Sequence, residues 1–164
     1  MRALRSLGSI VFAVFMSSSG ALAQGPPARG PGNASDMQAI HFLMMHRSQI
    51  HRTVTNLPNG VETLTESDDP AVAAQLRQHV RAMHDRMKTN RPIRLRDPLF
   101  AALFANADHI QLRYEDTPKG IRAFATSDDP YVAKLVQAHA AVVGQFLENG
   151  MSEMRANHPV PPRD

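Results

Sequence analysis

Residues 58–79, PNGVETLTESDDPAVAAQLRQH, recur as residues 118–139, PKGIRAFATSDDPYVAKLVQAH, sixty positions later and without a gap. Nine positions are identical in the two copies, and they include the Ser-Asp-Asp-Pro string and the final histidine. A repeat at fixed spacing indicates one supersecondary unit that is used twice. The sequence therefore predicts an internally duplicated fold with pseudo-twofold symmetry.

Four segments with one apolar face accompany the two copies. Apolar residues recur at spacings of three and four, the period of an amphipathic helix, over 36–54, 70–87, 98–110 and 130–147. The last three segments begin at Asp-Pro, where the aspartate can accept from free N–H groups of the first turn. Proline suits the next position because its missing N–H would have no partner there.

Two short extended arms surround each of the turns Pro58-Asn59-Gly60 and Pro118-Lys119-Gly120. Isolated hairpins are marginally stable in water, so we expect these two to lie against the helices or against each other. Each repeat is thus helix, hairpin, helix. The predicted fold class is mainly α, a four-helix bundle built from two tandem repeats. The alternative is a swapped or open arrangement that forms a homodimer.

The N-terminal residues have the pattern of an export signal. Arg2 and Arg5 precede a short apolar stretch, and Ala21-Leu22-Ala23 fits a cleavage site, so we expect a periplasmic or secreted protein. The apolar stretch is too short to span a bilayer, which disfavours an uncleaved membrane anchor. The predicted organisation is a signal peptide (1–23), a flexible Pro/Gly linker (24–35), the duplicated bundle (36–157) and a Pro-rich tail (158–164).

Composition excludes several kinds of chemistry. The chain has no cysteine, which excludes disulfides, thiolate metal sites, a cysteine nucleophile and covalent c-type haem attachment. Removing Arg2 and Arg5 leaves 18 − 2 = 16 Lys and Arg against 15 Asp and Glu, so no nucleic-acid partner is predicted. Hydrolase and nucleotide motifs are missing from the sequence, and whether the protein is an enzyme stays open.

Histidines are the candidate ligands. His79 and His139 hold equivalent positions beside the apolar faces of their helices, and bundles build metal and cofactor sites from such facing side chains. His46 is expected to turn inward too, and Met83 lies four residues after His79. Imidazole with thioether suits copper, and imidazole alone suits zinc, copper, nickel or haem iron. The alternative, a structural reading, is that these residues bind no ligand: backbone carbonyls accept hydrogen bonds from the histidines, and methionine fills the core.

Other histidines are weaker candidates. His41 and Met45 also have the i, i+4 spacing that can bring two ligands together. Steps of five residues rotate by about 140° on a helix, so His41, His46 and His51 cannot share one helix face. The remaining three histidines are expected in solvent: His84, His109 and His158.

A basic cluster follows the second predicted helix. Cations there complement the negative end of a helix dipole or simply form a solvated loop. Alternatively, Arg91, Arg94 and Arg96 bind the carboxylates of a haem or another acidic ligand, since guanidinium groups match carboxylate geometry.

Several strings look familiar together: TESDDP (65–70), RPIRLRDPLF (91–100), ATSDDPYV (125–132) and QAHA (137–140). Across residues 38–160 the chain resembles a family of small, uncharacterised exported bacterial proteins with a duplicated TSDDPxV…H repeat. The resemblance implies a shared fold and export, and it carries no activity and no catalytic residues to this chain.

The expected function is binding, delivery or electron transfer by an exported helical bundle that holds a transition metal (copper or iron) or haem. His79 and His139 would be ligands, with His46 and Met83 nearby. An interaction or scaffold module with a plain core is the first alternative. An enzyme of unknown type that uses a histidine as acid or base is the second.

Overall fold

The computed structural model describes residues 31–163, with side chains from Ala34 onward, so the predicted signal peptide and most of the linker lie outside the described residues. Within this range the helices are α1 (Pro31–Met45), α2 (Pro70–Lys88), α3 (Pro98–Ala105) and α4 (Pro130–Asn149). The strands are β1 (His51–Leu57), β2 (Gly60–Glu66), β3 (Gln111–Thr117) and β4 (Gly120–Thr126). Short 3₁₀ helices cover Arg47–Gln49, Ala107–His109 and Glu153–Arg155.

The predicted four-helix bundle is wrong, because the two hairpins join into one antiparallel sheet with the order β1-β2-β4-β3. The helix predicted over 36–54 ends at Met45, and its last residues belong to β1. Thr53, Val54 and Thr55 are β-branched and favour a strand, whatever their spacing relative to the apolar residues before them. The helix predicted over 98–110 likewise ends at Ala105.

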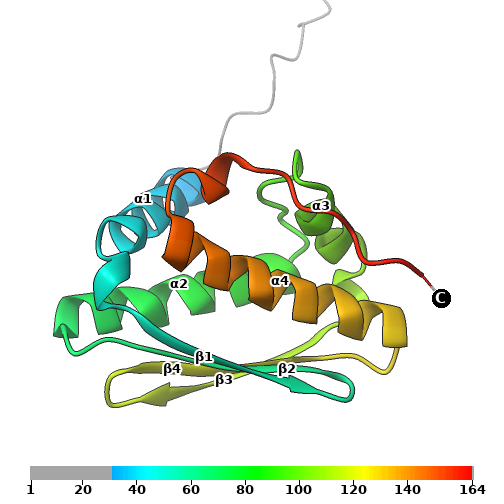
Figure 1. Cartoon of the computed structure of the whole chain (residues 1–164), viewed down its shortest axis with the longest axis horizontal. Coiled ribbons are helices and arrows are strands. Elements are labelled where there is room, and N and C mark those ends of the chain that lie inside the picture. The colour runs from blue at the N-terminus through cyan, green and yellow to red at the C-terminus, as the bar shows by residue number, and fades with distance from the viewer. Residues whose placement is uncertain (1–30, 164) are drawn as a thin grey trace, which may run out of the picture.

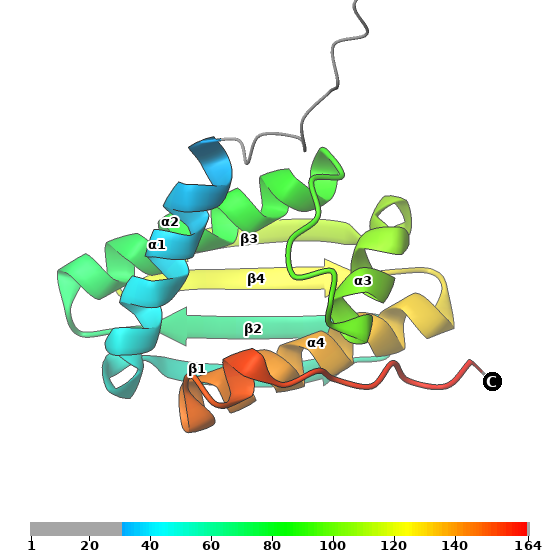
Figure 2. The same cartoon turned by 90° about the horizontal axis from the view of Figure 1, so that it is seen from above.

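The elements form three layers (Figure 1). The sheet is the base, α2 and α4 lie across one of its faces, and α1 and α3 lie above those two helices. In the view from above, β2 and β4 are visible between α2 and α4, with α1 and α3 at opposite ends (Figure 2). In the described part of the chain, no helix covers the other face of the sheet, and none is both long and apolar enough to cross a membrane.

The two repeats are interlocked. Helix α2 packs against β4 and α4 packs against β2, so each helix lies over the hairpin of the other repeat. Arg77 on α2 donates to the carbonyls of Thr117 and Gly120 at the β3–β4 turn, at 3.2 Å each. The equivalent residue on α4, Gln137, donates to two carbonyls at the β1–β2 turn, at 2.9 Å each. The pseudo-twofold symmetry predicted from the repeat is therefore present.

Two glycines allow the central strands to meet. A Cβ on Gly60 would lie 2.1 Å from the carbonyl oxygen of Ala125, and a Cβ on Gly120 would lie 2.0 Å from that of Thr65. Both carbonyls belong to the neighbouring central strand, which pairs antiparallel along its whole length. Any other residue at these positions would force β2 and β4 apart.

Aspartates cap the three helices that begin at Asp-Pro. Asp69 accepts from Ala71 and Val72, Asp129 makes the same pair of bonds at α4, and Asp97 accepts from the N–H of Leu99. These caps confirm the starts that the sequence predicts. The apolar core forms where α3 and α4 meet the sheet, around Leu99 and Leu135, and a second cluster lies between α1 and α2.

The C-terminal segment packs against the body. His158, expected in solvent, is buried. Its Nδ1 lies 2.7 Å from Oδ2 of the fully buried Asp97, and its Nε2 lies 3.0 Å from Oε1 of Glu153. Arg94 donates to the carbonyls of Met154 and Ala156, at 2.6 and 2.8 Å. A carboxylate that caps α3 therefore also holds the chain end, which no local sequence pattern indicates.

Candidate interior ligand site

His79 and His139 face the interior from equivalent places on α2 and α4. Each side chain is half-buried, but each Nδ1 is fully buried and has no hydrogen-bond partner among the described residues. The ring of Phe100 on α3 meets His139 edge-on, with 5.0 Å between ring centroids. The backbone carbonyls that the structural reading assigns to these histidines are therefore not found at Nδ1.

Both imidazoles are neutral at pH 7. Burial lowers the pKa of His79 to about 4, against an opposing effect of the Asp36 carboxylate. Burial also lowers the pKa of His139 to about 4, and the positive charge of Arg52 and a protonated His79 act in the same direction. His139 is thus close enough to both groups for their charges to reach it. Each neutral ring keeps one N–H donor and one lone pair.

Arg52 enters the same region from the sheet. It pairs with Thr65 across β1 and β2, so both side chains lie on the helix-facing side, and its Nη1 donates to Thr65 Oγ1 at 2.8 Å. Its Nε is buried without a partner, and burial lowers the pKa of the guanidinium to about 10. Among the described residues no carboxylate forms an ion pair with Arg52.

The centre of the sheet is not sealed by the helices. Thr63 and Ala123 pair across β2 and β4, and they alternate with the buried Val61 and Ile121 on the helix-facing side. Both nevertheless keep partial solvent exposure. The side chains at the centre of the helix-facing side are therefore small and partly exposed.

Four buried side-chain nitrogens of the described residues lack a hydrogen-bond partner: Nε of Arg52 and Nδ1 of His79, His84 and His139. An unpaired buried donor or acceptor costs about 1–3 kcal/mol. Nε of Arg52 is an obligate donor, and Nδ1 of His79 and of His139 can each carry the ring proton. Each of the three atoms can therefore donate to an acceptor, and the charges of Arg52 and of a protonated His79 act on His139.

The other predicted metal ligands lie elsewhere or lack a set of partners. His46 ends α1, where its Nδ1 donates to the carbonyl of Phe42 at 2.8 Å. Met83 is half-buried on α2, one turn beyond His79. Over residues 31–163, no three His, Asp or Glu side chains are arranged to hold a metal ion.

The three arginines of the predicted anion site make different contacts and do not form one site. Arg94 adopts a left-handed backbone conformation, and its guanidinium faces the rings of Phe100 and Phe146 at 5.0 and 5.1 Å. Its nitrogens are also engaged with the C-terminal segment and Asp97. Arg91 is exposed and donates to Thr89 Oγ1, and Arg96 is exposed.

Sequence reasoning missed Arg52, although a signal for it exists. The position equivalent to Arg52 in the second copy is Leu112, an apolar residue that faces the helices. A charged residue at an inward position of a strand, where the other copy is apolar, marks a departure from symmetry. Comparing β1 with β3, once both are known to be strands, would have found it.

The fold is thus a duplicated, interlocked α+β layer structure with an interior polar site near its pseudo-twofold axis. No family model, curated protein or solved structure matches the chain.

Proposed function

We propose that the protein binds a small anionic ligand between α2 and α4, using Arg52, His79 and His139. The observation that carries this proposal is the guanidinium of Arg52, which has a buried Nε and no carboxylate partner among the described residues. Removing a charge from water is costly unless an opposite charge and hydrogen bonds compensate. An anion would supply both.

The chemistry of the three groups suits carboxylate, sulfate or phosphate. A guanidinium presents N–H donors in a fixed planar fork that matches the oxygens of such anions. The neutral imidazoles add donors without adding charge, because their pKa values are about 4. With Nη1 on Thr65 at 2.8 Å, the guanidinium is oriented before the ligand arrives.

A transition metal or haem iron bound by His79 and His139 is the second candidate. The neutral state of both imidazoles favours it, because each ring keeps a lone pair at pH 7. Arg52 opposes it, since the positive charge that lowers the pKa of His139 would also repel a metal cation. We therefore rank the anion first.

Titration calorimetry separates the two candidates. The protein is titrated at pH 7 with phosphate, sulfate and acetate, and separately with Cu²⁺, Zn²⁺ and hemin. We expect saturable anion binding that Arg52→Met abolishes and that Arg96→Met, an exposed arginine of the predicted basic loop, leaves unchanged. Metal or hemin binding that a His79→Gln/His139→Gln variant loses, and that Arg52→Met strengthens, would support the second candidate instead.

We further propose that the protein is exported, as the sequence before position 24 predicts, so that this binding takes place in the periplasm or outside the cell. The scaffold alternative makes the opposite prediction for the interior. Under it, His79 and His139 become glutamine with ordinary changes in stability, and no ligand is lost because none binds.

A further inference from the structure

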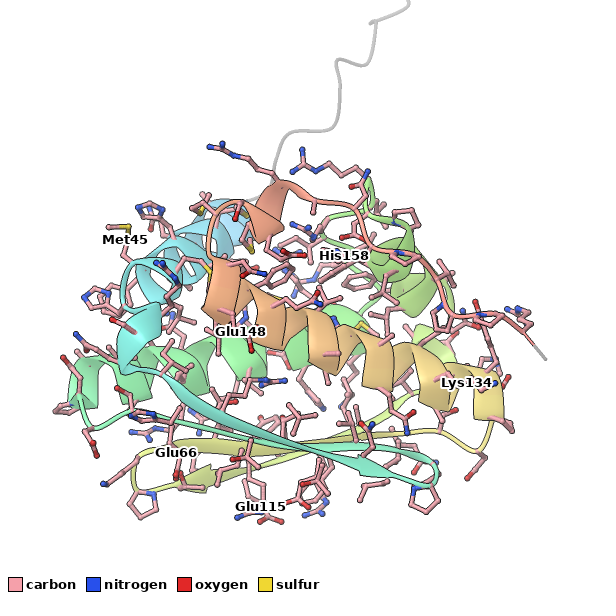
Figure 3. The ribbon with its side chains drawn as sticks, viewed as in Figure 1. Met45, Glu66, Glu115, Lys134, Glu148 and His158 are labelled. Atoms are coloured by element: carbon pink, nitrogen blue, oxygen red, sulfur yellow. The ribbon has the colours of Figure 1, made fainter. Side chains whose placement is uncertain are left out.

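The border between α2 and β3 is closed by side chains from both elements. Arg81 on α2 pairs with Asp116 on β3, and its guanidinium lies 5.9 Å from the ring centroid of Tyr114. The ring of His84 meets the ring of Tyr114 edge-on, with 5.3 Å between centroids. Glu115 points away from the helices (Figure 3), so its neighbour Tyr114 faces them. Two rings and an ion pair therefore fill this border.

The symmetry-related border, between α4 and β1, lacks all four of these side chains. The pseudo-twofold symmetry places smaller, uncharged residues there: Ala141, Gly144, Val54 and Asn56. Val54 pairs with Thr63 and so lies on the helix-facing side, yet it is 39% exposed. A Cβ on Gly144 would meet no atom within 4 Å. This border is therefore open at Val54 and Gly144.

Arg52 lies beside the open border. It is the helix-facing neighbour of Val54 on β1, and its charge reaches His139 on α4. At the closed border the equivalent residue is Leu112, which carries no charge. One architecture therefore supports a closed and an open border, and the open border is the one beside the buried positive charge. The opening is thus not a requirement of the fold.

We propose that the anion of the interior site is a small carboxylate with an aromatic ring, and that this ring occupies the open border between Val54 and Gly144. The inference rests on the proposed function and narrows its ligand class. The rings of Tyr114 and His84 fill the symmetry-related space, so the open border has room for a ring. A ring suits the uncharged surroundings of Val54, and a carboxylate suits the planar fork of Arg52.

The test is titration calorimetry of the full-length protein at pH 7 with benzoate and with acetate, which shares the carboxylate and lacks the ring. We expect the wild type to bind benzoate more tightly by about tenfold or more, because the ring leaves water on binding. Gly144→Leu fills the open border from the helix, and Val54→Tyr/Gly144→His rebuilds the ring pair of the closed border. Both variants should abolish the preference for benzoate over acetate. The matched control is Ala74→Leu, at an exposed position on α2, which should keep that preference.

The proposal is overturned if benzoate binds no more tightly than acetate, or if Gly144→Leu and the double variant keep the wild-type preference. An equal loss of both ligands in these variants would show that the border is only an entrance, and this result also rejects the ring position. A failure of the anion site itself looks different: neither ligand binds, or Arg52→Met changes nothing, and both proposals then fall.

NMR of the benzoate complex provides a second measurement. Nuclear Overhauser effects between the ring protons of benzoate and the methyl groups of Val54 must be present in the wild type. Their absence at saturating benzoate rejects the ring position.

Discussion

The Nδ1 atoms of His79 and His139 and the Nε of Arg52 are buried without protein partners. Native interiors contain few such atoms, and each one needs a physical explanation, such as an ordered water or a ligand. Burial favours the neutral form of both imidazoles and lowers the pKa of each to about 4. The consequence is a stability that depends on pH in a defined direction.

Stability should fall as the pH drops from 6.5 towards 4. A neutral buried histidine with a lowered pKa in the folded state contributes fully to the free energy of unfolding above about pH 6.5, the approximate pKa of histidine in the unfolded chain. Below that pH the unfolded chain takes up a proton that the folded protein does not, so this contribution is lost. The loss from pH 7 to pH 5 is at most about 2 kcal/mol for each ring. Urea unfolding in phosphate-free buffer measures it, and His79→Gln/His139→Gln should show a smaller loss than the exposed-site control His109→Gln. Equal losses would contradict the account.

The two hairpin glycines give a second test at single positions. Gly60→Ala and Gly120→Ala should each destabilise by about 3 kcal/mol or more, because the new Cβ meets a carbonyl of the adjacent strand. Gly144→Ala is the matched control. Its Cβ would meet no atom within 4 Å, so alanine should stabilise α4 by about 0.5–1 kcal/mol. Thermal unfolding measures all three, and a neutral Gly60→Ala would show that β2 and β4 can separate without cost.

At the scale of elements, Asp97 joins α3 to the C-terminal segment. It caps α3, accepts from the backbone N–H and the ring of His158, and pairs with Arg94. The net pKa of Asp97 is lowered, because the bonds from His158 and Arg94 together outweigh the opposing effect of burial. The pKa of His158 is raised for the reciprocal reason: burial lowers it, and the bonds to Asp97 and Glu153 more than compensate.

Asp97→Asn should separate these roles. Asparagine still caps a helix well, but it leaves the Arg94 and His158 interactions without their charge, and we expect a loss of about 3 kcal/mol. Asp69→Asn, at a cap with no buried ion pair, should change stability by less than about 1 kcal/mol. Limited proteolysis after residue 150 should accelerate only in Asp97→Asn. Equal protection in both variants would show that the charge of Asp97 does not hold the segment.

The same element has its own pH dependence, opposite in sign to that of the interior histidines. A raised folded-state pKa means that the contribution of His158 is present below about pH 6.5 and is lost as the pH rises through the folded value. Wild type and His158→Gln should therefore differ more in stability at pH 6 than at pH 9. A difference that grows towards pH 9 would contradict the assignment.

On the scale of the whole molecule, interlocking makes each half depend on the other. Helix α2 covers β4 and α4 covers β2, so a single repeat would expose the face that its partner helix buries. Fragments 31–91 and 92–163 should be unfolded alone and should fold when mixed. Circular dichroism and gel filtration measure this. Cooperative unfolding of either fragment alone would show that the repeats are separate domains.

Much of the fold is readable from local sequence patterns, and the missing part is non-local. The duplication, the hairpin turns and the Asp-Pro starts depend on neighbouring residues, and the structure confirms them. The sheet depends on pairing β2 with β4, sixty residues apart, which no local period encodes. Burial of His158 depends on Asp97, another distant residue. For the proposed interior site, the sequence indicates His79 and His139. Arg52 is found only from the strand register, which places it opposite Thr65 on the helix-facing side of the sheet.

The central claim is that Arg52, His79 and His139 receive one anion over the centre of the sheet. Side-chain ¹⁵N NMR of the two histidines during titration with phosphate, sulfate or acetate at pH 7 tests it most directly. We predict that both Nδ1 signals shift with the same saturation curve for at least one of these anions, and that Arg52→Met removes the response. If neither histidine responds to any of the three, or if Arg52→Met responds as the wild type does, the interior anion site does not exist.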